Sequence, residues 1–207
     1  IFPADCSTKV LLPFSSKKIS SLHRNGVINK LPEVFNKRQV CLVRNDLCSK
    51  TKKNRRNELN RFKKNGGEIV PVTQYNPVQI CNIYDTLFKK RWGVNVDRNT
   101  LHSLEKFITD NPSMIFGNVL QMNSQPCAYD LIIKSESPRW LYFDIPNGGM
   151  DPSYTHLSVG SVLMWVNTQQ AISLGISKGK ETRFSLGKPT MNYKKRWCDP
   201  HYLLRTI

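Results

Sequence analysis

The chain of 207 residues contains no apolar run of the length needed to cross a membrane, which is about eighteen residues or more. It also has neither an initiating methionine nor the zoned pattern of a signal peptide. We therefore expect Ile1 to follow residues of a longer protein. We expect that protein to be cytoplasmic, with a peripheral position on the cytoplasmic face of the inner membrane as an alternative.

Acidic residues are scarce, since 15 Asp and Glu stand against 31 Lys and Arg, and the formal net charge is +16. Such an excess attracts polyanions without selecting one of them. The sequence therefore predicts a polyanionic partner, with tRNA, DNA and an anionic membrane surface as the alternatives. It leaves the oligomeric state open, and a homodimer is one alternative.

Closely spaced cysteine pairs are absent as well. Without the CxxC spacing that zinc sites use, we predict no metal site. Several cysteines lie in apolar runs, which favours reduced, buried thiols in a reducing compartment over a disulfide framework. The six cysteines are Cys6, Cys41, Cys48, Cys81, Cys127 and Cys198.

Enough apolar material is present for a core, because 39% of the residues are hydrophobic and 10% are aromatic. Strand and helix patterns are mixed, without an internal repeat or a low-complexity linker, which predicts an α+β fold. Near the start we predict a strand at 9–14, a weak helical pattern at 16–30 that Gly26 interrupts, and a strand at 39–44 that pairs with the first.

Residues 50–64 predict a strongly basic helix that carries a single acid, Glu58. Leu59 and Phe62 give it a thin apolar stripe, and Gly66 and Gly67 follow its end. One interpretation is a solvated basic face, and the other is a dock for the phosphates of RNA, DNA or lipid. The predicted phosphate contacts are Lys52, Lys53, Arg55, Arg56, Arg61, Lys63 and Lys64.

The middle and end of the chain alternate between the two patterns. The periodicity predicts an edge strand at 68–73, helices at 77–93 and 98–110, and an antiparallel meander with strands at 113–122, 127–135 and 139–145. After a loop at 146–158 and a helix at 159–175, we predict a strand at 182–186, a compact basic and aromatic segment at 192–197, and a last strand or tail at 202–207.

The start of the helix at 159–175 is a candidate anion site. Its first turn, Ser158, Val159, Gly160 and Ser161, leaves backbone N–H groups without helical partners, and these groups favour an anion. The alternative is an ordinary capped helix with Ser158 as its N-cap.

Five segments carry a family resemblance: Asn-Arg-Arg-Asn-Glu-Leu-Asn-Arg-Phe at 54–62, Phe-Lys-Lys-Arg-Trp at 88–92, Ala-Tyr-Asp at 128–130, Phe-Ser-Leu-Gly at 184–187 and Tyr-Lys-Lys-Arg-Trp at 193–197. In this order they resemble the acyltransferases of the GNAT superfamily, in its Fem-like branch with the biotin-pathway-type acetyltransferase domains. The details also resemble the macrophage-inducible-gene family of enterobacterial proteins. That family is linked to survival against cationic antimicrobial peptides, and has been described both as transcription activators and as GNAT-like proteins.

The resemblance implies a GNAT-like α+β fold with a mixed, largely antiparallel twisted sheet that splays open around an acyl-CoA, whose pyrophosphate lies on the helix start at Ser158 to Ser161. The superfamily's usual Gln or Arg before two glycines is missing around Gly160, as it is in relatives that use aminoacyl-tRNA. The implied donor is therefore acyl-CoA or aminoacyl-tRNA. Residues 46–207 would form the GNAT-like domain, and residues 1–45 would be the remnant of a preceding half.

Acyl transfer needs a deprotonated amine and a protonated leaving group. Asp144, at a strand end, is the candidate base, although it also suits a cap on the following loop. Tyr193 is the candidate acid, and the alternative is that its side chain only packs over the sheet. His156 is a weaker candidate for a base or a phosphate contact. A Tyr-Lys pair recurs in Fem-like relatives, which implies that Lys194 positions substrate or phosphate.

These observations predict an N-acyltransferase, acting on acyl or aminoacyl groups, in a bacterial protein that contributes to resistance to cationic antimicrobial peptides. The alternative is a DNA-binding transcription activator that uses residues 50–64. A third alternative is a protein that sits on anionic lipid through the same charge.

Overall fold

The structure is a computed structural model that describes residues 9–13, 15–31 and 37–207. The chain forms two compact units, and each is described by itself. Unit 1 draws on residues 1–45, 135–144 and 174–207, and unit 2 on residues 46–134 and 145–173. The domain boundary at residue 45 that the sequence suggested stays a prediction.

Unit 1 is a sheet with the strand order β1-β10-β3-β9-β8, and β2 also pairs with β10. All of these pairs are antiparallel except β8 with β9. The strands are β1 (Ile19–Ser20), β2 (Lys30–Leu31), β3 (Gln39–Val43), the first half of β8 (Trp140–Met150), β9 (Glu181–Ser185) and β10 (Cys198–Thr206). Short 3₁₀ helices, η1 (Ser21–Gly26) and η6 (Asn192–Arg196), connect them.

Unit 2 continues β8 into the order β8-β7-β6-β4, with β5 paired to β7. Its strands are β4 (Gly67–Pro71), β5 (Ile115–Phe116), β6 (Asn118–Met122) and β7 (Gln125–Glu136). Its helices are α1 (Ser49–Lys64), α2 (Pro77–Trp92), α3 (Arg98–Asp110) and α4 (Val159–Ser177), with the 3₁₀ helices η3 (Val72–Gln74), η4 (Pro112–Met114) and η5 (Pro152–Leu157).

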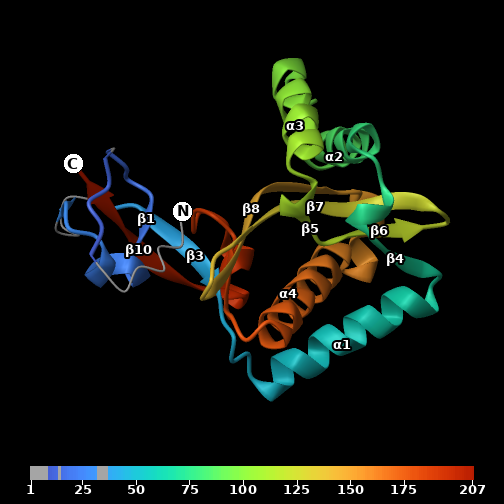
Figure 1. Cartoon of the computed structure of the whole chain (residues 1–207). Helices are drawn as coiled ribbons and strands as arrows, with labels where there is room; N and C mark the ends of the chain where they lie inside the picture. Colours follow the sequence, from blue (N-terminus) through green and yellow to red (C-terminus); the bar gives the residue numbers. More distant parts are fainter. Residues whose placement is uncertain (1–8, 14, 32–36) are drawn as a thin grey trace. The chain divides into compact units, whose positions relative to one another are not determined.

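Helices cover both faces of the sheet in unit 2, with α2 and α3 on one face and α1 and α4 on the other (Figure 1). Neighbouring residues of β7 show this division, because side chains alternate across a strand. Tyr129 packs with Tyr84 of α2, whereas Ala128 packs with Phe62 of α1 and Val162 of α4. The first residue of α4, Val159, is buried in the same cluster, so packing in this layer holds the start of α4.

The ladder between β8 and β9 is parallel, and the chain reaches β9 through α4. Its register runs from Trp140 with Glu181 to Asp144 with Ser185. On the face of these two strands opposite to the Asp144 side chain, Phe143 and Phe184 stack with their ring centroids 5.6 Å apart. Beyond Asp144, β8 continues to Met150 although β9 has ended at Ser185.

This arrangement confirms the predicted GNAT-like α+β architecture: a mixed, largely antiparallel sheet, flanked by helices, with one parallel pair joined through a helix. The helices predicted at 50–64, 77–93, 98–110 and 159–175 are also confirmed within two residues at each end. For α2 the local reasons are clear, because Asn76 and Gln79 form a capping box and Gly93 ends the helix at φ 77°.

Three predictions near the start of the chain are wrong. At 9–13 the described residues form no strand beyond one bridge between Val10 and Val27, because the Leu12 N–H bonds the Asn29 side chain instead of a ladder; Phe14 lies outside the described residues. The helical pattern at 16–30 resolves into β1, η1 and the start of β2. The strand at 39–44 exists as β3, but its partners are β10 and β9.

Two predictions in the meander also need correction. The expected strand at 113–122 is divided into η4, β5 and β6, with Gly117 at φ 101° between the strands. The expected loop at 146–158 is instead the second half of β8 followed by η5. The strand needs a glycine at position 149 because the backbone of α2 lies against it. A Cβ atom on residue 149 would lie 2.5 Å from the backbone nitrogen of Phe88.

Candidate functional site

Asp144 lies where the parallel ladder of unit 1 ends, opposite Ser185. Its carboxylate makes no salt bridge with the described residues. The other described acids of unit 1 are all paired: Glu136 with Lys178 and Lys180, Glu181 with Arg139, and Asp199 with Arg44. Among the described acids of unit 1, Asp144 is therefore the one without a salt bridge that could compete with a ligand.

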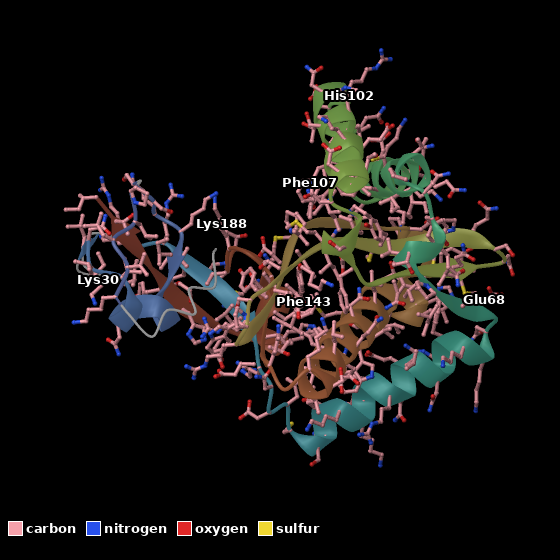
Figure 2. All side chains as sticks on the ribbon, in the orientation of Figure 1. Lys30, Glu68, His102, Phe107, Phe143 and Lys188 are labelled. Carbon is pink, nitrogen blue, oxygen red and sulfur yellow. The ribbon has the colours of Figure 1, made fainter. Side chains whose placement is uncertain are left out.

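A cavity of about 510 Å³ opens beside Asp144, and all its lining residues belong to unit 1. Its walls combine apolar side chains, such as Val40 and Leu203, with the hydroxyl groups of Ser185 and Thr190. Four cationic residues also line it: Lys18, Lys37, Arg38 and Lys188. Lys188, labelled in Figure 2, lies on the loop that follows β9.

Tyr142 lies two residues before Asp144 and so on the same face of β8. Its ring is buried. Burial raises the pKa of the Tyr142 hydroxyl, and the Asp144 carboxylate raises it further, while Ser185 acts in the opposite direction. The phenol therefore keeps its proton beside the Asp144 carboxylate.

Tyr193 and Lys194 lie on η6, also in unit 1. The ammonium of Lys194 donates to the carbonyl oxygens of Leu186, at 2.5 Å, and of Lys188, at 2.7 Å. It therefore holds the loop after β9 against η6. The side chain of Tyr193 is 38% exposed. Their predicted roles in protonating a leaving group and in positioning substrate stay predictions.

The predicted anion site lies in unit 2, at the start of α4. Ser158 has φ 56° and ends η5, and its carbonyl accepts the N–H groups of Ser161 and Val162. The N–H of Gly160 has no acceptor among the described residues. Because Gly160 is exposed whereas Val159 is fully buried, an anion at this helix start would meet the backbone at Gly160.

Arg61 is the basic residue that reaches this helix start. Its Nη2 donates to the Ser158 Oγ at 3.1 Å. His156, the weaker candidate, is exposed, and its Nδ1 lies 3.1 Å from the Ser153 carbonyl oxygen. The structure thus brings Arg61 together with Ser158, and it places Asp144, Tyr193 and Lys194 in the other unit.

The remaining basic residues of α1 divide by face. Leu59 and Phe62 point into the core, and Arg55 pairs with Glu58 at 2.6 Å. Nitrogen-tipped side chains project from α1 on the side away from α4 (Figure 2). The exposed cations among the predicted contacts are Lys53, Arg56, Arg61, Lys63 and Lys64, whereas Lys52 and Arg55 are partly buried.

A second carboxylate, Asp130 of β7, was not singled out from the sequence as a site residue. Burial raises its pKa to about 6, against the opposing attraction of Arg91. Arg91 Nη1 lies 3.4 Å from the carbonyl oxygen of Gly148, and a Cβ atom at Gly148 would overlap the Asp130 carboxylate. Asp130 is therefore enclosed between β8 and the end of α2.

Sequence reasoning also missed Tyr142 and the lysines of the unit 1 cavity. The spacing of Tyr142 and Asp144 in a predicted strand was a usable signal, because residues two apart share a face. Lys18, Lys37 and Lys188 carried no signal, since they are far apart in the sequence and meet only through the strand order of unit 1.

The described residues contain no group of three or more His, Cys, Asp and Glu side chains placed to hold a metal ion. None of the helices in the described part of the chain combines the length and the apolar character of a membrane span.

Two solved structures with TM-scores of 0.52 and 0.50 share the fold of this chain. A conserved protein of unknown function from Bacteroides thetaiotaomicron VPI-5482 is 12% identical with a TM-score of 0.52, over 82% of this chain and 60% of that chain. The C-terminal DUF2156 domain of an Agrobacterium fabrum protein, provisionally named a lysylphosphatidylglycerol synthetase, is 13% identical with a TM-score of 0.50, over 92% and 67%. A possible acetyltransferase from Clostridium difficile 630 is 15% identical with a TM-score of 0.48, over 62% and 85%.

Comparison with curated protein sequences found no match. The family model described as Mig-14 matches residues 1–206, nearly the whole chain. This match confirms the predicted relation to the macrophage-inducible-gene family. The chain belongs to the Mig-14 family.

Proposed function

We propose that this protein transfers an acyl or aminoacyl group to an amine and that Asp144 is the base. The observation that carries the proposal is the Asp144 carboxylate, which makes no salt bridge with the described residues, ends the parallel β8–β9 ladder and lines the cavity of unit 1. A carboxylate in this position binds an ammonium group and removes its proton. The GNAT-like fold supports the choice of acyl transfer, although a fold alone does not set a function.

The reaction balances without a further reactant. The acceptor ammonium gives a proton to Asp144, and the free amine nitrogen forms a C–N bond with the donor carbonyl carbon. The C–S bond of a thioester or the C–O bond of an aminoacyl ester breaks, and the leaving atom takes up a proton, for which Tyr193 is our candidate donor. The amine's second proton leaves with solvent.

The donor is proposed to be acyl-CoA, with aminoacyl-tRNA as the alternative. Both carry phosphates, and Arg61 together with the N–H of Gly160 offers a cation and an unpaired donor at the start of α4. The predicted contribution to resistance against cationic antimicrobial peptides stays a prediction.

The test is transfer from both donor classes to a panel of amines, read as release of free CoA thiol or as aminoacyl-amine product. Asp144→Asn should lower kcat/KM by about 100-fold or more. The matched control is Glu181→Gln, which removes a carboxylate from the adjacent strand where it pairs with exposed Arg139, and should leave the rate unchanged. The proposal would be refuted if neither donor class supported transfer, or if Asp144→Asn kept full activity.

The exposed face of α1 favours a second candidate function, the binding of nucleic acid as a transcription activator. Its exposed cations have no acid among them, since Glu58 is engaged by Arg55. The apolar residues Leu59 and Phe62 lie in the core, so α1 has no apolar face to insert into lipid. Contacts to phosphates predict a steep loss of affinity with salt.

Binding to duplex DNA, tRNA and anionic vesicles at several salt concentrations tests this candidate. Replacing Lys53, Arg56, Lys63 and Lys64 by Gln should lower the slope of log affinity against log salt by about 3 to 4 units. A sequence preference for duplex DNA would support the activator. Equal, weak binding to all three polyanions would count against it.

A further inference from the structure

The cavity of unit 1 has an excess of positive charge that the other described residues of the unit do not neutralise. Asp144 is the carboxylate in its lining, and four cationic residues surround the same space of about 510 Å³. Lys18, Lys37 and Lys188 form no salt bridge with any described carboxylate, and the described acids of unit 1 other than Asp144 are paired elsewhere. Both signs of charge in the cavity are therefore available to a ligand.

This charge pattern discriminates between acceptors. A simple alkylammonium would gain the Asp144 carboxylate but would enter a site where four other side chains repel it. A simple anion would gain the lysines but would face Asp144. A molecule that carries an ammonium group and an acidic group satisfies both parts of the site at once.

The size and walls of the cavity limit the ligand further. A volume of about 510 Å³ is within the range of small-molecule sites. Val40, Leu203 and Pro189 supply apolar wall, and Ser185 and Thr190 supply hydroxyl groups. The fitting molecule is therefore small, with a short carbon chain between its two charged groups.

We propose that this cavity binds the acceptor and selects a small amine that also carries a carboxylate or phosphate group. Asp144 takes the ammonium, and Lys18, Lys37 and Lys188 take the acidic group. The inference rests on the proposed transfer function only in calling this ligand the acceptor, because the binding itself needs no donor.

The experiment is calorimetric titration of the full chain, without donor, with matched pairs of probes. 4-Aminobutyrate is compared with n-butylamine, and O-phosphoethanolamine with ethanolamine. The acid-bearing member of at least one pair should bind about tenfold tighter or more, and the pair that shows it identifies carboxylate or phosphate. Equal affinities within both pairs, or no binding by any probe, would overturn the inference.

Variants assign the binding to the cavity. Lys37→Gln and Lys188→Gln change exposed side chains and should each weaken binding of the acid-bearing probe about five- to tenfold. The matched control is Lys195→Gln, which removes an exposed lysine outside the cavity lining and should change the affinity less than about twofold. Equal losses in all three variants would show general attraction to a basic protein and overturn the inference.

The outcomes separate this inference from the proposed function. Lysine-dependent binding of the acid-bearing probe without transfer from any donor would support the cavity and refute the transferase. Transfer that proceeds equally well to n-butylamine and 4-aminobutyrate would support the transferase and overturn the selectivity proposed for the cavity.

Discussion

Arg61 of α1 donates a hydrogen bond from Nη2 to the Ser158 Oγ, at 3.1 Å, directly before the first turn of α4. This contact places a guanidinium beside the N–H of Gly160, which has no acceptor among the described residues. A guanidinium and an unpaired N–H together favour a phosphate oxygen over neutral groups. The contact therefore joins the basic helix to the proposed donor site.

Arg61→Ala should weaken binding of acetyl-CoA about five- to tenfold, measured by titration calorimetry, because it removes the charge at the helix start. The stability of the fold should change by less than about 0.5 kcal/mol, since the side chain is exposed. Lys63→Ala is the matched control, because Lys63 is an exposed cation of α1 outside this contact. Equal losses in both variants would contradict a specific role for Arg61.

The position of α4 against the sheet depends on a buried polar contact with β6. The backbone N–H and the side-chain amide of Asn118 both donate to the Oδ1 of Asn167, at 3.0 and 2.9 Å. Asn167→Ala leaves the backbone N–H of Asn118 and one of its two amide hydrogens unpaired, while the Asn118 amide keeps its bond to Gln170 Oε1 at 2.6 Å. The variant should lower the free energy of unfolding by about 2 to 3 kcal/mol, measured by urea denaturation. Gln169→Ala, at an exposed position of the same helix, should cost less than about 0.5 kcal/mol. Similar costs for both would show that the contact is not stabilising.

Much of unit 2 could be predicted because its signals are local. The apolar spacing in α2, with Asn76 and Pro77 at its start and Gly93 at its end, specifies the helix without knowledge of the rest of the chain. The same holds for α3, where the side chain of Asp97 accepts the N–H of Thr100. Short-range chemistry of this kind is readable from a single sequence.

The misread segments depend on contacts between distant residues. Asn147, Gly148 and Gly149 have the composition of a turn, but here they extend β8 because α2 requires a residue without a side chain at Gly149. Lys18, Lys37 and Lys188 line one cavity only because of the strand order β1-β10-β3-β9. This order pairs strands from the two ends of the chain, so it cannot be read from local sequence. Asp144 was accessible to sequence reasoning because an acid in a predicted strand is a local feature, although the strand end expected there is wrong, since β8 continues to Met150. Its cationic surroundings were not accessible.

Two glycines of unit 2 should respond differently to a methyl group. At Gly149 the new Cβ would lie 2.5 Å from the backbone nitrogen of Phe88, which cannot move without shifting α2. Gly149→Ala should therefore cost about 3 kcal/mol or more in unfolding free energy. At Gly160 the nearest atom would be the Sδ of Met150, at 3.3 Å, so Gly160→Ala should cost less than about 1 kcal/mol. Thermal and urea unfolding measure both, and the reverse order would contradict the packing described for β8.

Asp130 should make stability depend on pH. Burial raises its pKa from an ordinary 3.8 to about 6 in the folded protein, so the folded state holds this proton more tightly than the unfolded state does. The contribution of protonated Asp130 to the free energy of unfolding is therefore complete below about pH 4 and is lost as the pH rises through about 6. Between these limits the wild-type protein should lose on the order of 2 kcal/mol that an Asp130→Asn variant keeps.

Urea denaturation at pH 4.5 and pH 7.5 measures this difference, because the other titrating groups are common to both proteins. Asp130→Asn should be less sensitive to the change in pH than the wild type and more stable relative to it at the higher pH. Asp46→Asn is the control, since Asp46 is exposed and makes no salt bridge with the described residues. Parallel pH profiles for the wild type and Asp130→Asn would mean that the carboxyl of Asp130 titrates alike in the folded and unfolded chains, so that its enclosure between β8 and α2 imposes no penalty on its charge.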